Sequence, residues 1–416
     1  MATLVIFAAC YALAITRKVK LAYVGIISAF LLVVILLPTN VMTPQAVLNS
    51  VRWDVLGIYW GFMMLSIVFA TSGVPKHLAK HVLHRTKNEG RALLALCGIT
   101  AFLSCFLENV GVVLIMAPIA LEAARRTKSS PITYLISIAI CANIVTTVTM
   151  IADPPALILA SESGMSFMNF FWFQGRIGLG IISIFAALAG LGTLYLVHFR
   201  KMQKKVHIEE EKIKMDYLPT GLFIGGVTAL ALNSYIGIGP GWIGLIVGAV
   251  ALILGHRTLR KMVAEFDWNS FLFIFGIFIV IGAVGAAGIL GDFANVIGGL
   301  GLNNPVITLV LLVWISVALS SFIDNVPYTV LMIPVCTSLA GTMGAQYMFP
   351  FLYGMLIGTG IGGNITPVGA TANVFACGLL EKRGYKVKLK EYMKISVPPT
   401  IVAVLVGYIL LQLLWM

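Results

Sequence analysis

Long runs of apolar residues, separated by short polar segments, are the dominant pattern along the chain. Many runs reach about 17–25 residues, the length that an α-helix needs to cross the hydrocarbon core of a bilayer. The basic residues gather between the runs, as they do in the cytoplasmic loops of membrane proteins. These basic clusters lie at residues 17–20, 76–91, 125–128, 200–214, 257–261 and 382–394. The pattern predicts a multi-pass protein of the cell (inner) membrane.

One apolar segment, at about residues 92–124, has basic clusters at both of its ends. Both ends are therefore expected on the cytoplasmic side. Its two apolar arms are short for complete spans, and the polar pair Glu108 and Asn109 lies between them. A re-entrant hairpin with a polar tip explains this arrangement, although two short spans with an outside turn satisfy the same charges.

A sequence repeat favours the hairpin. The segment LSCFLENVGVVLIMAP at 103–118 matches LSSFIDNVPYTVLMIP at 319–334, so that Glu108 corresponds to Asp324, 216 residues further along the chain. Internal repeats of this kind are common in secondary transporters. A second re-entrant hairpin is therefore predicted at about 304–342.

The repeat divides the chain into two predicted halves, 1–200 and 217–416. They are joined by a charged cytoplasmic linker at 201–216, which contains an acidic run at 209–211. Each half is predicted to hold five transmembrane helices and one hairpin, and because five is odd the second half is inverted relative to the first. The predicted fold is an all-α polytopic membrane protein, with both termini on the extracytoplasmic side.

Each half also contains a predicted broken helix, at about 132–163 and about 350–381. The first is interrupted by Asp153 and the two prolines that follow it, because proline removes a backbone donor and clashes with the preceding turn. The second is rich in glycine. Unwound backbone is tolerated in a membrane only where it lines a cavity, and there it can bind ions. The two hairpin tips and the two broken helices are expected to meet at one central site.

Composition supports the membrane assignment and excludes several functions. The chain is 59% hydrophobic and 11% charged, against about 25% charged residues in a typical soluble domain. The net charge of +12 is divided among loop clusters and predicts no nucleic-acid binding. All six cysteines lie in apolar runs without metal-site spacing, and the six histidines lie at span ends or in loops. We therefore expect no enzyme activity, no metal site and no cofactor.

Three acidic residues lie deep in apolar sequence: Glu108, Asp153 and Asp324. An ionisable group at membrane depth costs at least ~2.5–3.5 kcal/mol and usually has a functional role. Burial disfavours the charged form, so Glu108 and Asp324 are the predicted proton-coupling residues. The complete predicted substrate- or ion-binding set is Glu108, Asn109, Thr149, Asp153, Asp324, Asn325, Asn364, Thr366, Thr371 and Asn373.

The chain resembles the ion transporter superfamily, in particular the branch of ArsB-type arsenite efflux pumps, NhaD-type Na⁺/H⁺ antiporters and the melanosomal P protein. The resemblance rests on LENVGVVLIMAP, IDNVPYTVLMIP, IADPPALILAS and GGNITPVGATANVFACGLLEKRGY and covers nearly the whole chain. The chain departs from the branch at Glu108, where Asp is usual, at Ala156, where Asn is common, and at 145–147, where glycines are common. The second half is therefore expected to hold the more typical binding site.

The resemblance implies a secondary active transporter with alternating access. Two carboxylates at the tips would repel a di- or tricarboxylate, and no Lys or Arg lies deep enough to compensate. The first prediction is proton-coupled efflux of arsenite or antimonite as neutral trihydroxides. The alternatives are a Na⁺/H⁺ antiporter of the NhaD type and a cation-coupled anion or dicarboxylate transporter. The coupling ion is H⁺ or Na⁺. The expected partners are membrane lipid, a small inorganic substrate, and either a second copy of the chain or an energising ATPase subunit.

Overall fold

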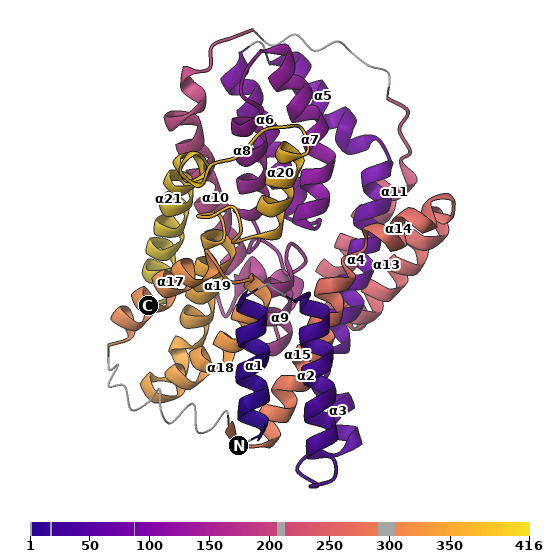
Figure 1. Ribbon diagram of the computed structural model, residues 1–416, viewed down its shortest axis with the longest axis vertical. Coiled ribbons are helices and arrows are strands. Elements are labelled where there is room, and N and C mark those ends of the chain that lie inside the picture. Colours follow the sequence, from indigo (N-terminus) through magenta and orange to yellow (C-terminus); the bar gives the residue numbers. More distant parts are fainter. Residues whose placement is uncertain (1, 17–18, 87, 206–212, 290–303) are drawn as a thin grey trace.

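The computed structural model describes the chain except for residues 1, 17–18, 87, 206–212 and 290–303 (Figure 1). The described part is almost entirely helical. Its only sheet is a hairpin of two short strands, β1 (Trp172–Phe173) and β2 (Arg176–Ile177). The acidic run at 209–211, which belongs to the predicted cytoplasmic linker, lies outside the described residues.

The helices follow one another with short connections. In the first half they are α1 (Ala2–Thr16), α2 (Leu21–Leu36), α3 (Pro44–Ser50), α4 (Trp53–Thr71), α5 (Val74–Arg85), α6 (Glu89–Ser104), α7 (Asn109–Arg126), α8 (Pro131–Asn143), α9 (Pro154–Glu162) and α10 (Leu179–Val197). In the second half they are α11 (Leu218–Ala231), α12 (Asn233–Ile236), α13 (Pro240–Leu254), α14 (Leu259–Glu265), α15 (Trp268–Ala286), α17 (Pro305–Ser320), α18 (Asn325–Met343), α19 (Met348–Gly362), α20 (Thr371–Glu381) and α21 (Leu389–Trp415).

Several of these helices are long and apolar enough to cross a membrane. By length and composition, five qualify among the described residues, in α4, α10, α15, α18 and α21. The pair Pro240–Leu254 and His256–Glu265, bent by 79°, is a sixth candidate. Shorter apolar helices lie in α1, α2, α8, α11 and α17. The five transmembrane helices expected in each half, and the inverted orientation of the second half, remain predictions.

One group of helices, which we call the scaffold body, consists of α1–α4 and α11–α15. Within it α2 packs along α15 and α4 packs along α13. Both pairs cross at glycines: a Cβ on Gly276 would lie 2.4 Å from the carbonyl carbon of Gly25, and a Cβ on Gly61 would lie 1.8 Å from the carbonyl oxygen of Gly244. Each pair joins a helix of the first half to one of the second, so the scaffold body is built from both halves.

The remaining large helices form a second group, the hairpin body, consisting of α6–α10 and α17–α21. The α6–α7 pair packs on α8 and the α17–α18 pair packs on α19, while α10 packs along α21. Figure 1 shows α6 and α7 in the upper half of the view and α18 and α19 in the lower half. The two bodies touch where α4 contacts α7 and α9, and where α15 contacts α18.

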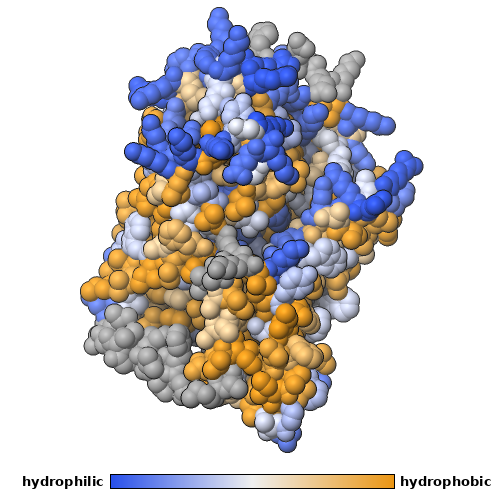
Figure 2. Space-filling view, in the orientation of Figure 1, coloured by the Kyte–Doolittle hydropathy of each residue, from blue (hydrophilic) through white to orange (hydrophobic). Residues whose placement is uncertain are grey.

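The surface divides into an apolar and a hydrophilic part. Figure 2 shows hydrophilic residues gathered at the upper end of the molecule and a broad apolar surface below it. The apolar surface includes side chains that would be costly to expose to water, such as Phe185, Leu188 and Leu196 on α10, which are 53%, 60% and 61% exposed. Such a surface is suited to contact with lipid, and the hydrophilic end contains the basic helix α5.

Candidate functional site

The turn between α6 and α7 presents Glu108 to the interior. Glu108 is the N-cap of α7, and its Oε1 and Oε2 accept hydrogen bonds from the backbone N–H groups of Val110 at 3.0 Å and Gly111 at 2.8 Å. An acidic N-cap satisfies otherwise unpaired backbone donors at the start of a helix. This local role explains why the carboxylate is held in one place.

The turn between α17 and α18 has the same design. Asp324 is the N-cap of α18, and its Oδ1 accepts from the N–H of Val326 at 3.1 Å. The next residue, Asn325, has its Oδ1 2.6 Å from the hydroxyl of Ser320. The two hairpins therefore place equivalent acids at equivalent helix starts.

The two turns differ in one respect. The first-half equivalents of Ser320 and Asn325 are Ser104 and Asn109, both buried. Neither the hydroxyl oxygen of Ser104 nor the Oδ1 of Asn109 has a hydrogen-bond partner among the described residues. Buried polar atoms without partners are rare and need an explanation, such as an ion or water.

The chain between α8 and α9, and between α19 and α20, is not helical; these are the segments in which the sequence predicts broken helices. In each half a threonine of the unwound segment ties it to the neighbouring hairpin. The hydroxyl of Thr149 donates to the carbonyl of Cys105, and the hydroxyl of Thr366 donates to the carbonyl of Ser321. Each threonine therefore fixes the unwound segment against the end of the first hairpin helix.

Three asparagines join the two broken helices to each other. The Nδ2 of Asn143, at the end of α8, lies 3.0 Å from the Oδ1 of Asn364 and 3.0 Å from the Oδ1 of Asn373. Asn373 in turn donates to the carbonyl of Gly363 at 3.1 Å. All three asparagines are buried. This network satisfies polar groups that the unwound backbone would otherwise leave unpaired.

A small pocket lies where the turns and the broken helices meet. Its volume is about 40 Å³, enough for an ion and a few waters, since one water needs about 10–15 Å³ of such space. Four carboxylates line it, and its described lining includes no Lys or Arg. The polar residues of the lining are Tyr59, Glu108, Asn109, Asn143, Asp153, Asp267, Ser270, Asp324, Asn325 and Thr371.

All four acids occupy the N-cap position of a helix: Glu108 of α7, Asp153 of α9, Asp267 of α15 and Asp324 of α18. Asp153 differs from the others because its side chain makes no capping hydrogen bond. A helix N-terminus is equivalent to roughly half a positive charge, so four of them offset only about half of four ionised carboxylates. The pocket therefore retains negative charge unless protons or cations bind.

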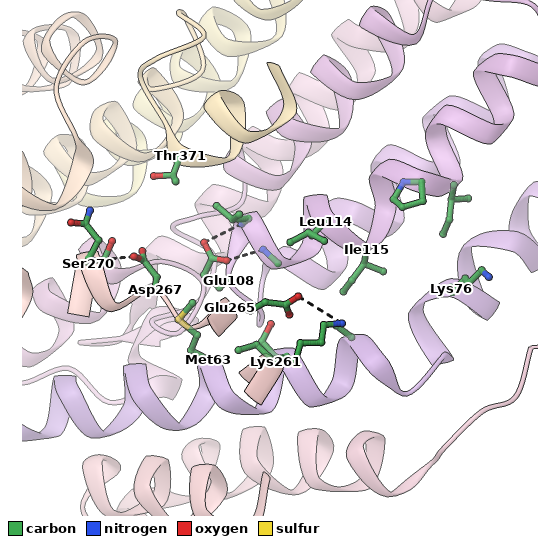
Figure 3. A pocket seen from close by; sticks show the side chains of 18 of the residues that line it. Met63, Lys76, Glu108, Leu114, Ile115, Lys261, Glu265, Asp267, Ser270 and Thr371 are labelled. Carbon is green, nitrogen blue, oxygen red and sulfur yellow. Dashed lines mark hydrogen bonds and ion pairs between the residues drawn. The ribbon is translucent and has the colours of Figure 1, made fainter. Parts of the chain in front are cut away.

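A second, larger cavity of about 610 Å³ adjoins this pocket and shares Glu108, Asp267 and Asp324 with it. Figure 3 shows Asp267 between Ser270 and Glu108, with Thr371 above them in the view. Towards the hydrophilic end the cavity is lined by Lys76, Lys261 and Glu265. Lys261 and Glu265 form an ion pair at 3.7 Å. We call this space the inner cavity, because its lysines belong to clusters predicted to be cytoplasmic.

A third cavity, of about 510 Å³, lies between α4 and α9 and is called the outer cavity. An ion pair stands at its edge. The guanidinium of Arg52 donates from Nε to Oε1 of Glu162 at 2.8 Å and from Nη2 to Oε2 at 3.0 Å. Arg52 precedes α4 of the scaffold body and Glu162 ends α9 of the hairpin body, so this pair joins the two bodies.

The predicted site residues divide into two groups. Those that line the small pocket are Glu108, Asn109, Asp153, Asp324, Asn325 and Thr371. Those that lie behind it, in buried hydrogen bonds, are Thr149, Asn364, Thr366 and Asn373. Sequence reasoning missed Tyr59, Asn143, Asp267 and Ser270. Asp267 directly precedes a long apolar run, and this position at the start of a span is a signal that the sequence does contain.

Comparison with known proteins agrees with this architecture. A family model described as "Citrate transporter" (CitMHS) matches residues 11–357. An uncharacterised transporter of Mycobacterium tuberculosis is 26% identical over 98% of this chain and 97% of its own. The magnetosome protein MamN of Magnetospirillum gryphiswaldense is 26% identical, over 81% and 79%. The P protein of Mus musculus is 23% identical over 87% of this chain and 54% of its own.

Among solved structures, the chain is similar to the YdaH transporter of Alcanivorax borkumensis, with a TM-score of 0.53 over 88% of this chain and 85% of that one. At 13% identity this likeness concerns the fold alone. The predicted all-α transporter architecture is thereby confirmed at the level of the fold. The Mycobacterium tuberculosis relative and YdaH are named as transporters, in agreement with the prediction of a non-enzymatic protein.

Proposed function

We propose that this chain, which belongs to the citrate transporter (CitMHS) family and is a secondary membrane transporter, exchanges a monovalent cation of the Na⁺ type for protons. The observation that carries the proposal is the small pocket with four carboxylates and no Lys or Arg in its described lining. Carboxylates that face one another in such a space cannot all be ionised without a counter-charge. Protons and a cation are alternative ways to supply that charge.

The unpaired acceptors of the first half support a cation. Asn109 lines the pocket, and its buried Oδ1 has no hydrogen-bond partner among the described residues. The hydroxyl oxygens of Ser104 and Thr146, outside the pocket lining, are also buried without partners in the described chain. Oxygen atoms of carboxylates, amides and hydroxyls are the ligands that hard cations prefer. Unwound backbone between half-helices supplies further carbonyl oxygens in transporters of this kind.

Within the exchange we assign one role to Asp153 and another to Glu108 and Asp324. The latter two cap helices, whereas the Asp153 side chain makes no capping hydrogen bond. A proton on Asp153 therefore disrupts no helix cap. In this scheme Glu108 and Asp324 hold the cation in place, and Asp153 alternates between the protonated and the cation-bound form.

A neutral trihydroxide such as arsenite is the second candidate cargo. Its three O–H groups could donate to the carboxylates and to the unpaired oxygen of Asn109, and it adds no charge to the pocket. Free citrate is disfavoured, because its three negative charges would enter a space that already holds four acids. A tricarboxylate would require the inner cavity and bound protons or metal cations to neutralise it.

The proposal is tested with purified protein in proteoliposomes under an imposed pH gradient. Na⁺, As(III) and citrate are added separately, and proton movement is followed with a pH-sensitive dye while uptake of each solute is measured directly. Proton movement that depends on Na⁺, and is lost in Asp153→Asn, supports cation exchange. Transport of As(III) or citrate without Na⁺-dependent proton movement would overturn it.

A further inference from the structure

The residues just before α4 and α15 occupy equivalent places in the two halves. Arg52 and Asp267 are each followed by a tryptophan and, at the same distance, by Gly61 and Gly276. The corresponding helix ends are also alike, because Gly73 and Gly288 have positive φ angles of 79° and 76°. The two equivalent positions nevertheless have opposite charges.

Asp267 lies on the scaffold body but faces the acids of the hairpin body. It lines both the small pocket and the inner cavity, next to Glu108 and Asp324. Its Oδ1 accepts from the N–H of Ser270 at 3.0 Å, which holds the carboxylate in position. In Figure 3 Asp267 lies between Ser270, to which its carboxylate is bonded, and Glu108. In the arrangement that the structure shows, a carboxylate of the scaffold body therefore adds to the cation affinity of a pocket whose other acids belong to the hairpin body.

Arg52 has no comparable local role. A cation at a helix N-terminus is unfavourable, and the Arg52 side chain makes no capping hydrogen bond to α4. It lines the outer cavity and is held there by Glu162 of the hairpin body. Movement of the hairpin body past the scaffold would separate this ion pair and leave the guanidinium facing the outer cavity.

We propose that Asp267 and Arg52 give the transport site a different cation affinity on its two sides, high at the inner cavity and low at the outer cavity. The inference rests on the proposed cation exchange and adds a preferred direction to it. Asp267 helps to load a cation from the inner cavity. Once the site opens to the other side, Arg52 offsets the charge of Asp54, which lines the same outer cavity, so a cation is held less strongly there and its release is favoured. The site is thereby adapted to export cations.

The inner half of this proposal can be tested without transport. Thr371 lines both the pocket and the inner cavity, so Thr371→Cys, combined with Cys105→Ala, places a thiol at the site. The rates of its reaction with a cationic and an anionic methanethiosulfonate reagent are then compared. Asp267→Asn should lower the ratio of the cationic to the anionic rate by about fivefold, since it removes one nearby charge. The asparagine can still cap α15.

A matched control is Asp216→Asn. Asp216 also accepts a backbone hydrogen bond at the start of a helix, from the N–H of Leu218 at 3.0 Å, but it lines neither the pocket nor the inner cavity. The rate ratio should not change in this variant. An unchanged ratio in Asp267→Asn, or an equal fall in both variants, would overturn the inference whether or not the protein transports Na⁺.

The outer half is tested by Na⁺ transport from each side of vesicles with one orientation. Asp267→Asn should raise the KM for Na⁺ at the inner side by about tenfold and leave the outer KM unchanged, while Arg52→Gln should lower only the outer KM. Glu162→Gln breaks the same ion pair but keeps the Arg52 charge, so its outer KM should stay close to that of the wild type. If Arg52→Gln and Glu162→Gln behave alike, Arg52 acts only through the ion pair and the inference fails.

The two assays separate the inference from the proposed function. A wild-type protein that moves no Na⁺ contradicts the proposed cation exchange, while the thiol ratios still decide whether Asp267 sets the potential of the inner cavity. Conversely, Na⁺ exchange with identical effects of Asp267→Asn on both sides supports the proposed function and rejects the side-dependent affinity.

Discussion

The carboxamide of Asn143 donates to the side-chain oxygen of Asn364 across 3.0 Å, although the two residues are 221 positions apart in the sequence. Asn143 ends α8, and Asn364 lies in the unwound segment between α19 and α20. The bond therefore joins the broken helix of one half to that of the other at the wall of the small pocket, which Asn143 lines. It couples the geometry of the site to the packing of both halves.

Replacement of Asn143 by alanine should destabilise the protein and impair transport together. The change leaves the buried Oδ1 of Asn373 without this donor, which costs about 1–3 kcal/mol, while the Oδ1 of Asn364 keeps only the longer hydrogen bond from the Nδ2 of Asn373 at 3.5 Å. Thermal unfolding in detergent measures the loss. A melting temperature equal to that of the wild type would mean that the network does not stabilise the fold.

Thr149→Val and Thr366→Val should have similar effects on stability. Each removes a hydroxyl that ties an unwound segment to the neighbouring hairpin, and each leaves a carbonyl, of Cys105 or Ser321, without this donor. We expect each variant to lose about 1–3 kcal/mol of stability. Denaturant or thermal unfolding of the two variants side by side provides the comparison. A large loss in one and none in the other would contradict the equivalence of the two bonds.

Gly61→Ala should disrupt the scaffold body. An added Cβ would lie 1.8 Å from the carbonyl oxygen of Gly244, so α4 and α13 would have to separate. Overpacking of this kind typically costs about 1–3 kcal/mol, and more where backbone blocks the space. Gly192→Ala is the matched control, because nothing lies within 4 Å of its Cβ and alanine favours a helix. The fraction of monodisperse protein after purification is measured for both variants. Equal fractions would contradict the close crossing of α4 and α13.

Asp324→Asn and Glu108→Gln should leave the fold intact but abolish ion-coupled transport. Asparagine is a good N-cap, so the start of α18 keeps its hydrogen bond, while the charge that binds a cation is lost. Proton movement driven by Na⁺ in proteoliposomes should fall at least tenfold in both variants. The melting temperature of Asp324→Asn should change little, whereas that of Glu108→Gln should fall, because glutamine has one acceptor oxygen for the two N–H groups that Glu108 caps. Full activity in either variant would remove that acid from the proposed exchange.

The predicted hairpins and breaks coincide with features of the helix order, while the re-entrance of the hairpins remains a prediction. The hairpins were expected at about 92–124 and 304–342, and the structure has α6–α7 over Glu89–Arg126 and α17–α18 over Pro305–Met343. The breaks follow from proline at 154–155 and from the glycines around Asn364. These features depend on residues close together in the chain, whose conformational preferences can be judged without knowledge of the fold.

Which residues line the small pocket depends on packing between segments that are distant in the sequence. The sequence alone is less informative about this packing. Asp267 lies at the start of a predicted span, where an acid is an ordinary N-cap, and only the approach of α15 to α18 brings it to Asp324. Asn143 of the first half donates an amide hydrogen bond to the second broken helix. The two halves therefore share part of the site, and the expected difference between a typical second half and an altered first half is smaller than the sequence suggests.

The central claim is that protons and a cation compete for the four-carboxylate pocket. The most direct test is to add Na⁺ to purified protein in weakly buffered detergent solution and to follow the pH with an indicator dye. The account predicts that Na⁺ releases protons from the wild type, with a saturable concentration dependence, and that Asp153→Asn and Asp324→Asn abolish the release. A wild-type protein that releases no protons on Na⁺ addition, or a release that both variants retain, would contradict it.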